Sequence, residues 1–181
     1  MKFIETKLKG CFIIEPKVFG DDRGYFLESY NHQKLSAAIG YDVTFVQDNQ
    51  SYSSYGVLRG LHLQTGKNAQ AKLVRVLSGT VLDVAVDVRP NSETYGQHLS
   101  IELSEENKKQ LFVPRGFAHG FLVLSETAEF FYKVDNDYAP KSESGLLFND
   151  SQLGINWGIA ESELTIAPKD LLQPLLIDFN P

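Results

Sequence analysis

The chain has 181 residues, of which 43% are hydrophobic and 22% are charged, as in a soluble globular domain. Its net charge is −6 and its isoelectric point is about 5.2, so no overall basic field exists to attract a nucleic-acid polymer. Cys11 is the only cysteine, which excludes an intrachain disulfide and a cluster of thiolate metal ligands. We expect one domain over residues 1–181, cytoplasmic and without a membrane partner, because no signal peptide or membrane-spanning apolar run is recognisable.

Short runs rich in β-branched and aromatic residues recur along the chain, separated by Gly, Pro, Asn or Ser. In chain order, these runs predict strands at residues 10–16, 25–30, 43–51, 57–64, 72–77, 80–88, 99–103, 110–113, 120–124 and 128–134. Two short helices are predicted, one at residues 32–39 with Gly40 as its stop signal and one at residues 168–172. The pattern favours an all-β jelly-roll sandwich or barrel with a few marginal helices.

Two details of the strand pattern lead to specific predictions. Ser78 and Gly79 form a short turn between two strand runs, which predicts that these runs pair as a hairpin. In the second run, alternate residues from Leu82 onward are apolar, whereas Asp83 and Asp87 lie on the other face. That alternation predicts a half-buried strand.

The most informative feature is an imidazole with two permanent cations on segments that otherwise read as strands. Arg59 and His62 share one run, and Lys72 begins a later one. Strict alternation would put Arg59 and His62 on opposite faces of their strand. Gly60 lies between them, and a glycine inside a strand often marks a bulge. We therefore expect a bulge at Gly60 that brings both side chains to the same face.

His62 has a structural and a chemical interpretation. A lone histidine on a strand is more often a hydrogen-bonded structural residue than a catalyst. Beside two cations, however, the neutral imidazole is favoured, and a neutral imidazole is an available general base at neutral pH. Such a base needs a carboxylate to orient it. Spacing alone leaves Asp83, Asp87 and Asp170 as candidates.

Lys72 and Tyr132 also keep two interpretations each. Lys72 either extends from a strand end to water or places its ammonium against a developing enolate oxygen. Tyr132, in register with Phe130 and Val134, is either a core aromatic or a proton donor, since a phenol stays protonated at pH 7. Together with His62, these residues suit the removal of a proton beside a carbonyl.

Three further segments bear on the kind of site. No metal is expected, because Gly60 and Gln64 flank His62 where a His-x-His motif would need histidine. No glycine-rich phosphate loop is present, and residues 114–120 predict a turn into a strand. Residues 19–28 are most simply a loop that enters a strand. Residues 47–51 form either an exposed strand end or a set of ligand-facing polar groups.

Eight motifs together resemble the dTDP-4-dehydrorhamnose 3,5-epimerase family. In chain order they are DRGYFLE at 22–28, QDN at 47–49, LRGLH at 58–62, KLVRV at 72–76, DVAVD at 83–87, PRGFAHGF at 114–121, FYK at 131–133 and KD at 169–170. Each motif is weak alone, but their order and spacing along nearly the whole chain are specific. The chain departs from the family pattern in the loop at 64–69, which lacks the usual proline, and at Lys141, where an acid is commoner.

The resemblance implies a cupin-like jelly roll that forms a homodimer and uses no metal or organic cofactor. It implies that His62 is the base, Asp170 its carboxylate partner, Tyr132 the acid and Lys72 the group that polarises the C4 ketone. The other positions that match substrate-binding residues of the family are Arg23, Phe26, Glu28, Gln47, Asn49, Arg59, His119, Tyr138, Glu143 and Lys169. Tyr138 matches the aromatic residue that stacks on the thymine.

The expected reaction is the inversion of C3 and C5 in dTDP-4-dehydro-6-deoxy-D-glucose, which gives dTDP-4-dehydro-L-rhamnose in dTDP-L-rhamnose biosynthesis. One alternative is an epimerase that acts at a single carbon, or a ketoisomerase, on a related dTDP-4-keto-6-deoxy sugar. Another is a sugar-binding β-barrel without catalytic activity. The two enzymatic possibilities differ in how a sugar lies between His62 and Tyr132, which the sequence does not decide.

Overall fold

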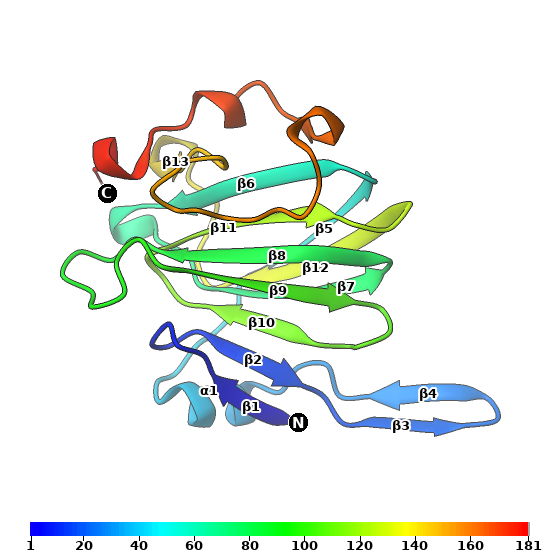
Figure 1. The fold of residues 1–181 in the computed structure, drawn as a ribbon. Helices are drawn as coiled ribbons and strands as arrows, with labels where there is room; N and C mark the ends of the chain where they lie inside the picture. The colour runs from blue at the N-terminus through cyan, green and yellow to red at the C-terminus, as the bar shows by residue number, and fades with distance from the viewer. Residues whose placement is uncertain (181) are drawn as a thin grey trace.

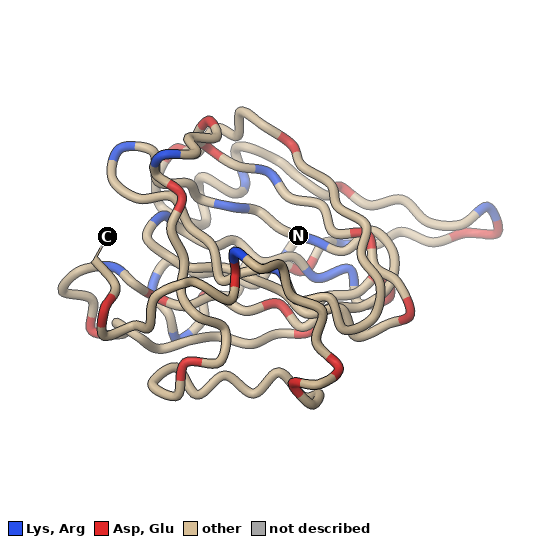
Figure 2. Tube along the Cα trace, turned by 90° about the horizontal axis from the view of Figure 1, so that it is seen from above, with Lys and Arg blue, Asp and Glu red and all other residues tan. Residues whose placement is uncertain are grey.

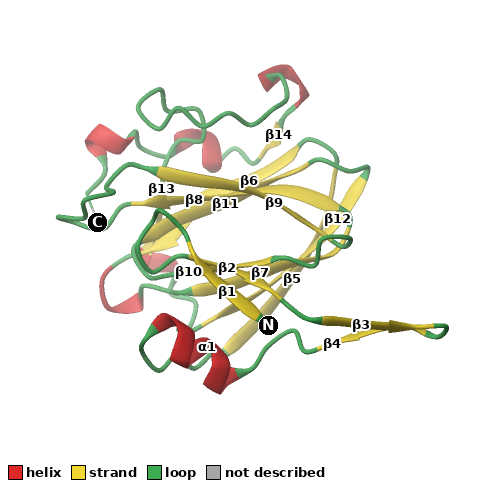
Figure 3. Ribbon diagram, turned by 60° about the horizontal axis from the view of Figure 1, so that its bottom comes forward, coloured by secondary structure: helices red, strands yellow, loops and turns green. Residues whose placement is uncertain are grey.

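Two β-sheets face each other in the computed structural model, which describes residues 1–180 (Figures 1 and 3). Sheet I has the strand order β1 (Lys2–Glu5), β2 (Phe12–Glu15), β10 (Gln110–Val113), β7 (Lys72–Ser78), β12 (Thr127–Val134) and β5 (Gln47–Ser54). Sheet II has the order β13 (Glu143–Gly145), β6 (Val57–Gln64), β11 (Phe117–Val123), β8 (Thr80–Asp87) and β9 (His98–Ser104). The short strand β14 (Thr165–Ile166) runs parallel to β6. The predicted all-β jelly roll is confirmed.

The main core lies between the sheets. Val74 and Val76 of β7 and Phe130 of β12 pack against Ala85 of β8 and Phe121 of β11. The rings of Phe121 and Phe130 stack with their centroids 4.1 Å apart. Inward-facing side chains of two sheets interdigitate in this way in β-sandwiches, and their burial is the main stabilising contribution.

A second core covers the outer face of sheet II. Val84 and Val86 of β8 pack against Phe148 and Trp157 of the C-terminal segment, which crosses sheet II on the outside (Figure 3). The indole N–H of Trp157 donates a hydrogen bond to the Phe148 carbonyl at 2.9 Å. Strand β8 is therefore buried on both faces, and the half-buried strand predicted from its alternation is wrong.

The acids of β8 lie on its inner face, not toward solvent. Asp83 and Asp87 lie on the same face of β8 as Val81 and Ala85, which belong to the core between the sheets. Both carboxylates are fully buried. The apolar side of the alternation instead faces the C-terminal segment. The sequence pattern separated the two faces correctly, but it did not reveal that a later segment covers the apolar one.

The predicted hairpin at Ser78 and Gly79 is also wrong. Ser78 pairs with Glu129 of β12 in sheet I, whereas Thr80 pairs with Ser104 of β9 in sheet II. The turn therefore carries the chain from one sheet to the other. Gly79 has φ +80°, and an added Cβ would lie 2.1 Å from the Thr127 carbonyl oxygen, so only glycine fits this turn.

The helix α1 (His32–Ile39) confirms the first helix prediction. Asn31 caps its N-terminus by accepting a hydrogen bond from the Lys34 N–H, and Gly40 ends it in the left-handed conformation. The helix lies outside sheet I, where Leu35 is buried against Val43 (Figure 3). None of the helices in residues 1–180 is long and apolar enough to cross a membrane.

The second helix prediction, at residues 168–172, is only partly right. The structure has a single 3₁₀ turn, η4 (Asp170–Leu172), with a hydrogen bond from the Leu172 N–H to the Lys169 carbonyl. The other 3₁₀ turns are η1 (Gly66–Asn68), η2 (Pro140–Ser142), η3 (Glu161–Glu163) and η5 (Leu176–Asp178). A segment of this length has room for one turn, and Gln173 is already extended.

A hairpin of β3 (Val18–Asp21) and β4 (Gly24–Leu27) projects from the body and pairs with neither sheet (Figure 1). The strand predicted at 25–30 ends at Leu27, because Asn31 already caps α1. The strand predicted at 43–51 begins later, since Val43 packs under the helix. Most other predicted strands agree to within one or two residues, β11 begins three residues earlier than predicted, and β1, β3, β13 and β14 were not predicted.

Candidate active site

A pocket with a cavity volume of about 370 Å³ opens between the two sheets. Strands β5, β7 and β12 of sheet I and β6, β11 and β13 of sheet II contribute to its walls, with residues that follow β14 at the mouth. The pocket brings together nine of the predicted site residues: Asn49, Arg59, His62, Lys72, His119, Tyr132, Glu143, Lys169 and Asp170. Residues more than a hundred positions apart in the chain therefore meet in one cavity.

A bulge in β6 puts Arg59 and His62 on the same wall of this pocket. His62 lies opposite His119 of β11, and Arg59 lies opposite Phe121. Between these pairs β6 advances three residues (62 − 59) and β11 advances two (121 − 119), so β6 carries one extra residue. The bulge predicted at Gly60 is confirmed.

The bulge requires a glycine for two reasons. Gly60 has φ +124°, which L side chains rarely adopt. An added Cβ would also lie 2.5 Å from the Cα of Gly120 on the neighbouring strand. The close approach of these two backbones is what allows the cation and the imidazole to share one wall.

His62 and Asp170 form a hydrogen-bonded pair at the pocket wall. The His62 Nε2 lies 2.7 Å from an Asp170 carboxylate oxygen, and the Gly60 N–H donates to the other oxygen at 3.3 Å. Burial by itself raises the pKa of Asp170, but these hydrogen bonds outweigh it and hold the pKa below its usual value. The carboxylate is therefore ionised and can only accept, so Nε2 of neutral His62 carries its proton and Nδ1 has a free lone pair.

The structure also accounts for the two carboxylates that spacing left as alternatives. Asp83 accepts from the His119 Nε2 at 3.0 Å, and both side chains are buried. Asp87 binds the Arg89 guanidinium through both oxygens. Burial raises the pKa of Asp87, but the hydrogen bonds from Arg89 and two hydroxyl groups outweigh it and lower the pKa to about 2. Neither carboxylate contacts His62.

Lys72 does not extend to water. Its side chain is only 9% exposed, and the ammonium lines the pocket and donates to the His62 carbonyl at 3.1 Å. Burial lowers the pKa of Lys72 to about 8. A lysine with a lowered pKa and no carboxylate bound to it, within residues 1–180, is available to a negative charge on a ligand.

Tyr132 approaches the pocket from the sheet opposite to His62. It lies on β12, where it pairs with Asn49 of β5 and Val74 of β7. Burial raises the pKa of Tyr132, and the nearby Arg59 only partly offsets this. The phenol is therefore protonated at neutral pH, and an imidazole and a phenol face one cavity from its two sides.

A hydrogen-bonded group of three side chains lies at the pocket mouth. Glu143 accepts from the Lys169 ammonium at 2.9 Å and from the Tyr138 hydroxyl at 3.0 Å. The hydrogen bond from Lys169 lowers the pKa of Glu143, and the hydrogen bond to Glu143 raises the pKa of Tyr138. Tyr138 does not line the cavity, but its side chain is 57% exposed beside the mouth.

Four other predicted binding residues lie outside the cavity. Gln47 is close to it, and its amide donates to Asn49 at 2.7 Å. Arg23 is at the tip of the β3–β4 hairpin and binds Asp21. The remaining two, Phe26 and Glu28, lie on or just after β4, and Glu28 pairs with Lys34 of α1.

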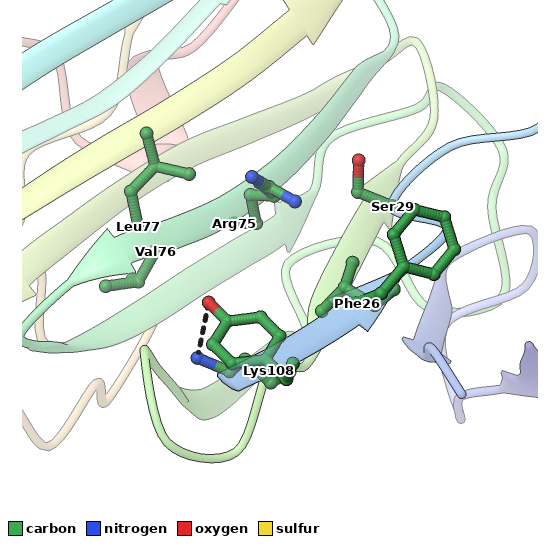
Figure 4. A pocket seen from close by; sticks show the side chains of 8 residues that line it. Phe26, Ser29, Arg75, Val76, Leu77 and Lys108 are labelled. Carbon is green, nitrogen blue, oxygen red and sulfur yellow. Dashed lines mark hydrogen bonds between the residues drawn. The ribbon is translucent and has the colours of Figure 1, made fainter. Parts of the chain in front are cut away.

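Phe26 belongs to a different pocket, at the base of the hairpin (Figure 4). This cavity of about 290 Å³ is bounded by β4 and by Arg75 and neighbouring residues of β7. Lys108 and Tyr25 also line it, and the Lys108 ammonium donates to the Tyr25 hydroxyl at 3.1 Å. None of the four predicted catalytic residues lines this pocket.

The pocket between the sheets also contains residues that the sequence did not single out. Phe130 and Phe121 line it with their stacked rings, and the Phe130 ring also stacks on His119 with centroids 6.1 Å apart. The register of Phe130 with Tyr132 was a usable signal for the first residue. Position 120 requires glycine because its backbone lies against that of Gly60. No signal in the linear sequence indicates that these two glycines are in contact.

Charge in this acidic chain is mixed locally. Figure 2 shows basic and acidic positions interspersed along the trace, including both signs at the hairpin tip. Within the pocket, Arg59 has no ion-pair partner among residues 1–180, while Lys169 is paired with Glu143. Residues 1–180 contain no group of three or more His, Cys, Asp or Glu side chains placed to hold a metal ion.

A jelly roll whose two sheets place a histidine–aspartate pair, a protonated tyrosine and a buried lysine around one cavity defines a cupin-like enzyme equipped for proton transfer. Comparison with known proteins narrows this class. The family described as dTDP-4-dehydrorhamnose 3,5-epimerase matches residues 5–178. The chain belongs to this family.

Individual relatives agree over nearly the whole chain. The dTDP-4-dehydrorhamnose 3,5-epimerase of Salmonella typhimurium is 54% identical over 176 residues, which cover 97% of this chain and 96% of that protein. The crystal structure of the enzyme of that name from Elizabethkingia anophelis is 58% identical, with a TM-score of 0.97 and coverage of 100% and 99%. A Legionella pneumophila epimerase in complex with dTDP-4-keto-L-rhamnose is 46% identical, with a TM-score of 0.94 and coverage of 99% and 94%.

Proposed function

We propose that this protein inverts C3 and C5 of dTDP-4-dehydro-6-deoxy-D-glucose and so produces dTDP-4-dehydro-L-rhamnose, a step in dTDP-L-rhamnose biosynthesis. The observation that carries this proposal is the placement of His62, with Asp170 behind it, and Tyr132 on opposite sheets of one cavity. Membership of the epimerase family supports the substrate and the isomerase activity. The whole chain acts as one epimerase domain in the cytoplasm and uses no cofactor.

The chemistry begins with proton removal beside the ketone. A 4-keto group acidifies the hydrogens on C3 and C5, because the carbanion formed delocalises onto the ketone oxygen. Nδ1 of His62 takes the proton, and the ionised Asp170 stabilises the resulting imidazolium through Nε2. The C–H electron pair moves into the enolate, whose oxygen is stabilised by the Lys72 ammonium.

Inversion is completed from the other side of the ring. On the face opposite His62, the C=C electron pair of the enolate forms a new C–H bond with the phenolic proton of Tyr132, while a lone pair of the enolate oxygen re-forms the C4 ketone. The phenolate then regains a proton from water and His62 releases its proton to water, so both groups return to their starting states. The same sequence at the second carbon gives the doubly inverted product.

The nucleotide part of the substrate is held by the residues around the cavity. Arg59 and the pocket-mouth residues Lys169 and Glu143 bind its polar groups, with Asn49 and His119 deeper in the cavity. Gln47 supports Asn49. Tyr138 stacks on the thymine, for which its exposed ring is accessible.

The hairpin residues act in a homodimer. Arg23, Phe26 and Glu28 match substrate-binding positions of the family, yet they lie away from the cavity of their own chain. Phe26 is 69% exposed on a hairpin that projects from the body (Figure 1). The hairpin therefore completes the cavity of a second copy of the chain, and the arginine adds a cation for the diphosphate.

Mixing two inactive variants tests this arrangement. In a dimer of an Arg23→Ala chain and a His62→Ala chain, one cavity has an intact His62 and receives an intact hairpin. Random exchange at equal amounts should restore about one quarter of wild-type turnover. If mixing restored no activity, the exchange of hairpins would be contradicted. That result would mean that an active cavity needs Arg23 and His62 from one and the same chain.

Deuterium incorporation tests the proposed reaction against its alternatives. The protein is incubated with dTDP-4-dehydro-6-deoxy-D-glucose in D₂O, and the sugar is analysed by mass spectrometry and NMR. Label at both C3 and C5 is expected. Label at one carbon would show a single-carbon epimerase or a ketoisomerase instead, and binding of the nucleotide sugar without any label would show a binding protein.

A further inference from the structure

Ser53 contacts the pocket arginine, although none of the sequence motifs includes it. Ser53 lies on β5 of sheet I, opposite Ala128 of β12, and is only 7% exposed. The Arg59 Nε donates a hydrogen bond to the Ser53 hydroxyl oxygen at 3.1 Å. Arg59 lies on β6 of sheet II, so this hydrogen bond joins the two sheets beside the cavity.

Arg59 differs from three of the four other arginines in the kind of partner it has, and from Arg75, whose buried Nε has no hydrogen-bond partner, in being held by a side chain. Within residues 1–180, three arginines bind carboxylates, namely Arg23 with Asp21, Arg89 with Asp87 and Arg115 with Asp135. A carboxylate positions a guanidinium but also neutralises its charge. A serine hydroxyl positions it and leaves the charge available.

The atoms used in the hydrogen bond also matter. The guanidinium presents its donors in a rigid planar fork. Because Ser53 takes the Nε–H, both terminal nitrogens of Arg59 remain free for an anion, and these two nitrogens can form paired hydrogen bonds with phosphate oxygens in the end-on arrangement. Fixing the side chain beforehand also reduces the rotamer entropy that is lost when a ligand binds.

We propose that Ser53 is a positioning residue that holds Arg59 for the diphosphate of the nucleotide sugar without neutralising its charge. This inference rests on the proposed function for the identity of the ligand. Ser53 acts through Arg59 and contacts no reacting atom. Its effect therefore falls on binding of the diphosphate and not on proton transfer.

A pair of substitutions of equal shape tests the hydroxyl. Threonine and valine differ only in a hydroxyl in place of a methyl group, and both suit a strand. We expect Ser53→Val to raise the Kd of dTDP and the KM about tenfold, which corresponds to about 1.4 kcal/mol. Ser53→Thr should stay within about threefold of wild type, and kcat should change less than twofold in either variant.

Two controls separate positioning from a general structural effect. Ser54→Ala removes a hydroxyl from the exposed side of the same strand and should leave dTDP binding unchanged. In an Arg59→Ala background, Ser53→Val should have no further effect on dTDP binding, since the two residues act as one unit. Melting temperatures should match between the Thr and Val variants.

Equal dTDP affinity of the Thr and Val variants would overturn the inference. A loss of affinity that persists in the Arg59→Ala background would overturn it as well. A wild-type protein that binds dTDP with this dependence on Ser53, yet incorporates no deuterium into the sugar, would support the positioning role and contradict the proposed reaction. The two failures are therefore distinguishable.

Discussion

Two histidines lie opposite each other in sheet II, each paired with an aspartate, and the comparison between the two pairs indicates what separates a reactive pair from a structural one. His62 on β6 lies opposite His119 on β11, and each donates from Nε2 to a buried carboxylate. The His62 side chain is 26% exposed, whereas the His119 side chain is 6% exposed. The chemistry of the two pairs is the same, but a ligand has much better access to His62.

The two carboxylates also come from different surroundings. Asp83 lies in the middle of β8, between strands and beside core residues. Asp170 begins the η4 turn near the surface of the sheet, where its own N–H is bound by the Ala167 carbonyl. We therefore infer that the His119–Asp83 pair holds the sandwich together and that Asp170 orients His62 as a base.

Removal of the accessible histidine should have the largest effect. His62→Ala should lower kcat about 10⁴-fold, because His119, the other histidine that lines the cavity, is only 6% exposed and is much less accessible to a ligand. Binding of dTDP should stay within a few-fold of wild type. The matched change His119→Ala should mainly lower the free energy of unfolding, by about 3 kcal/mol, because it leaves the Asp83 carboxylate buried without its partner, and it should raise KM about tenfold. Steady-state kinetics and calorimetric titration with dTDP measure the effects on kcat, KM and binding.

Equal losses of kcat in the two histidine variants would remove the distinction between the pairs. Retention of turnover in His62→Ala would identify another base. A melting temperature for each variant shows whether a loss of rate follows from unfolding.

Substitutions of the two aspartates should affect different properties, since Asp170 is proposed to act in catalysis and Asp83 in stability. Asp170→Asn should lower kcat about 10³-fold, since the amide no longer stabilises the imidazolium, with a melting temperature within a few degrees of wild type. Asp83→Ala should instead lower the free energy of unfolding by about 3 kcal/mol, because it leaves His119 buried without its partner. Denaturant unfolding measures the stability of each variant, and turnover per folded molecule measures its catalytic activity. A larger stability loss from Asp170→Asn would contradict it.

Tyr132→Phe should separate the two halves of the reaction. Without the phenol, His62 can still remove and return a proton on its own face, so exchange of substrate hydrogens with D₂O should fall less than tenfold. Completed inversion should fall about 10²-fold, because the opposite face has no donor. NMR follows both processes in one sample. Equal loss of exchange and inversion would count against Tyr132 as the donor.

The pH dependence should report Lys72 and is the smallest effect. Its pKa is about 8, so the ammonium is charged below that value and neutral above it. Since the proposed role of the charged form is to stabilise the enolate, kcat/KM should decrease as the pH rises through about 8. In Lys72→Arg the guanidinium stays charged, and this decrease should disappear even if the rate is lower. An unchanged high-pH limb in that variant would assign it to another group.

The local features of the site were predictable from the sequence where a single residue type decides the geometry. Gly60 between a cation and an imidazole predicted a bulge, and the structure has one at a position where the positive φ and the nearby Gly120 backbone admit only glycine. Asn31 and Gly40 similarly fix the ends of α1. Such features depend on one residue and its neighbours, which the sequence shows directly.

Features that depend on distant segments were not predictable from the residues alone. Asp170 lies 108 positions from His62, and spacing could not favour it over Asp83. Asp87 is buried because its face of β8 points toward the core between the sheets, where Arg89 pairs with it, and the alternation does not reveal which face lies inside. The turn at Gly79 could join strands within one sheet or between two sheets, and only the pairing of both strands decides this. Ser53 became significant only when β5 was placed beside Arg59.

The most direct test is a structure of the His62→Ala variant with dTDP-4-dehydro-6-deoxy-D-glucose bound. The sugar ring should lie between position 62 and the Tyr132 hydroxyl, with the C4 oxygen within hydrogen-bonding distance of the Lys72 ammonium. A sugar that lies outside this cavity, or whose two faces do not point toward position 62 and the Tyr132 hydroxyl, would contradict the account.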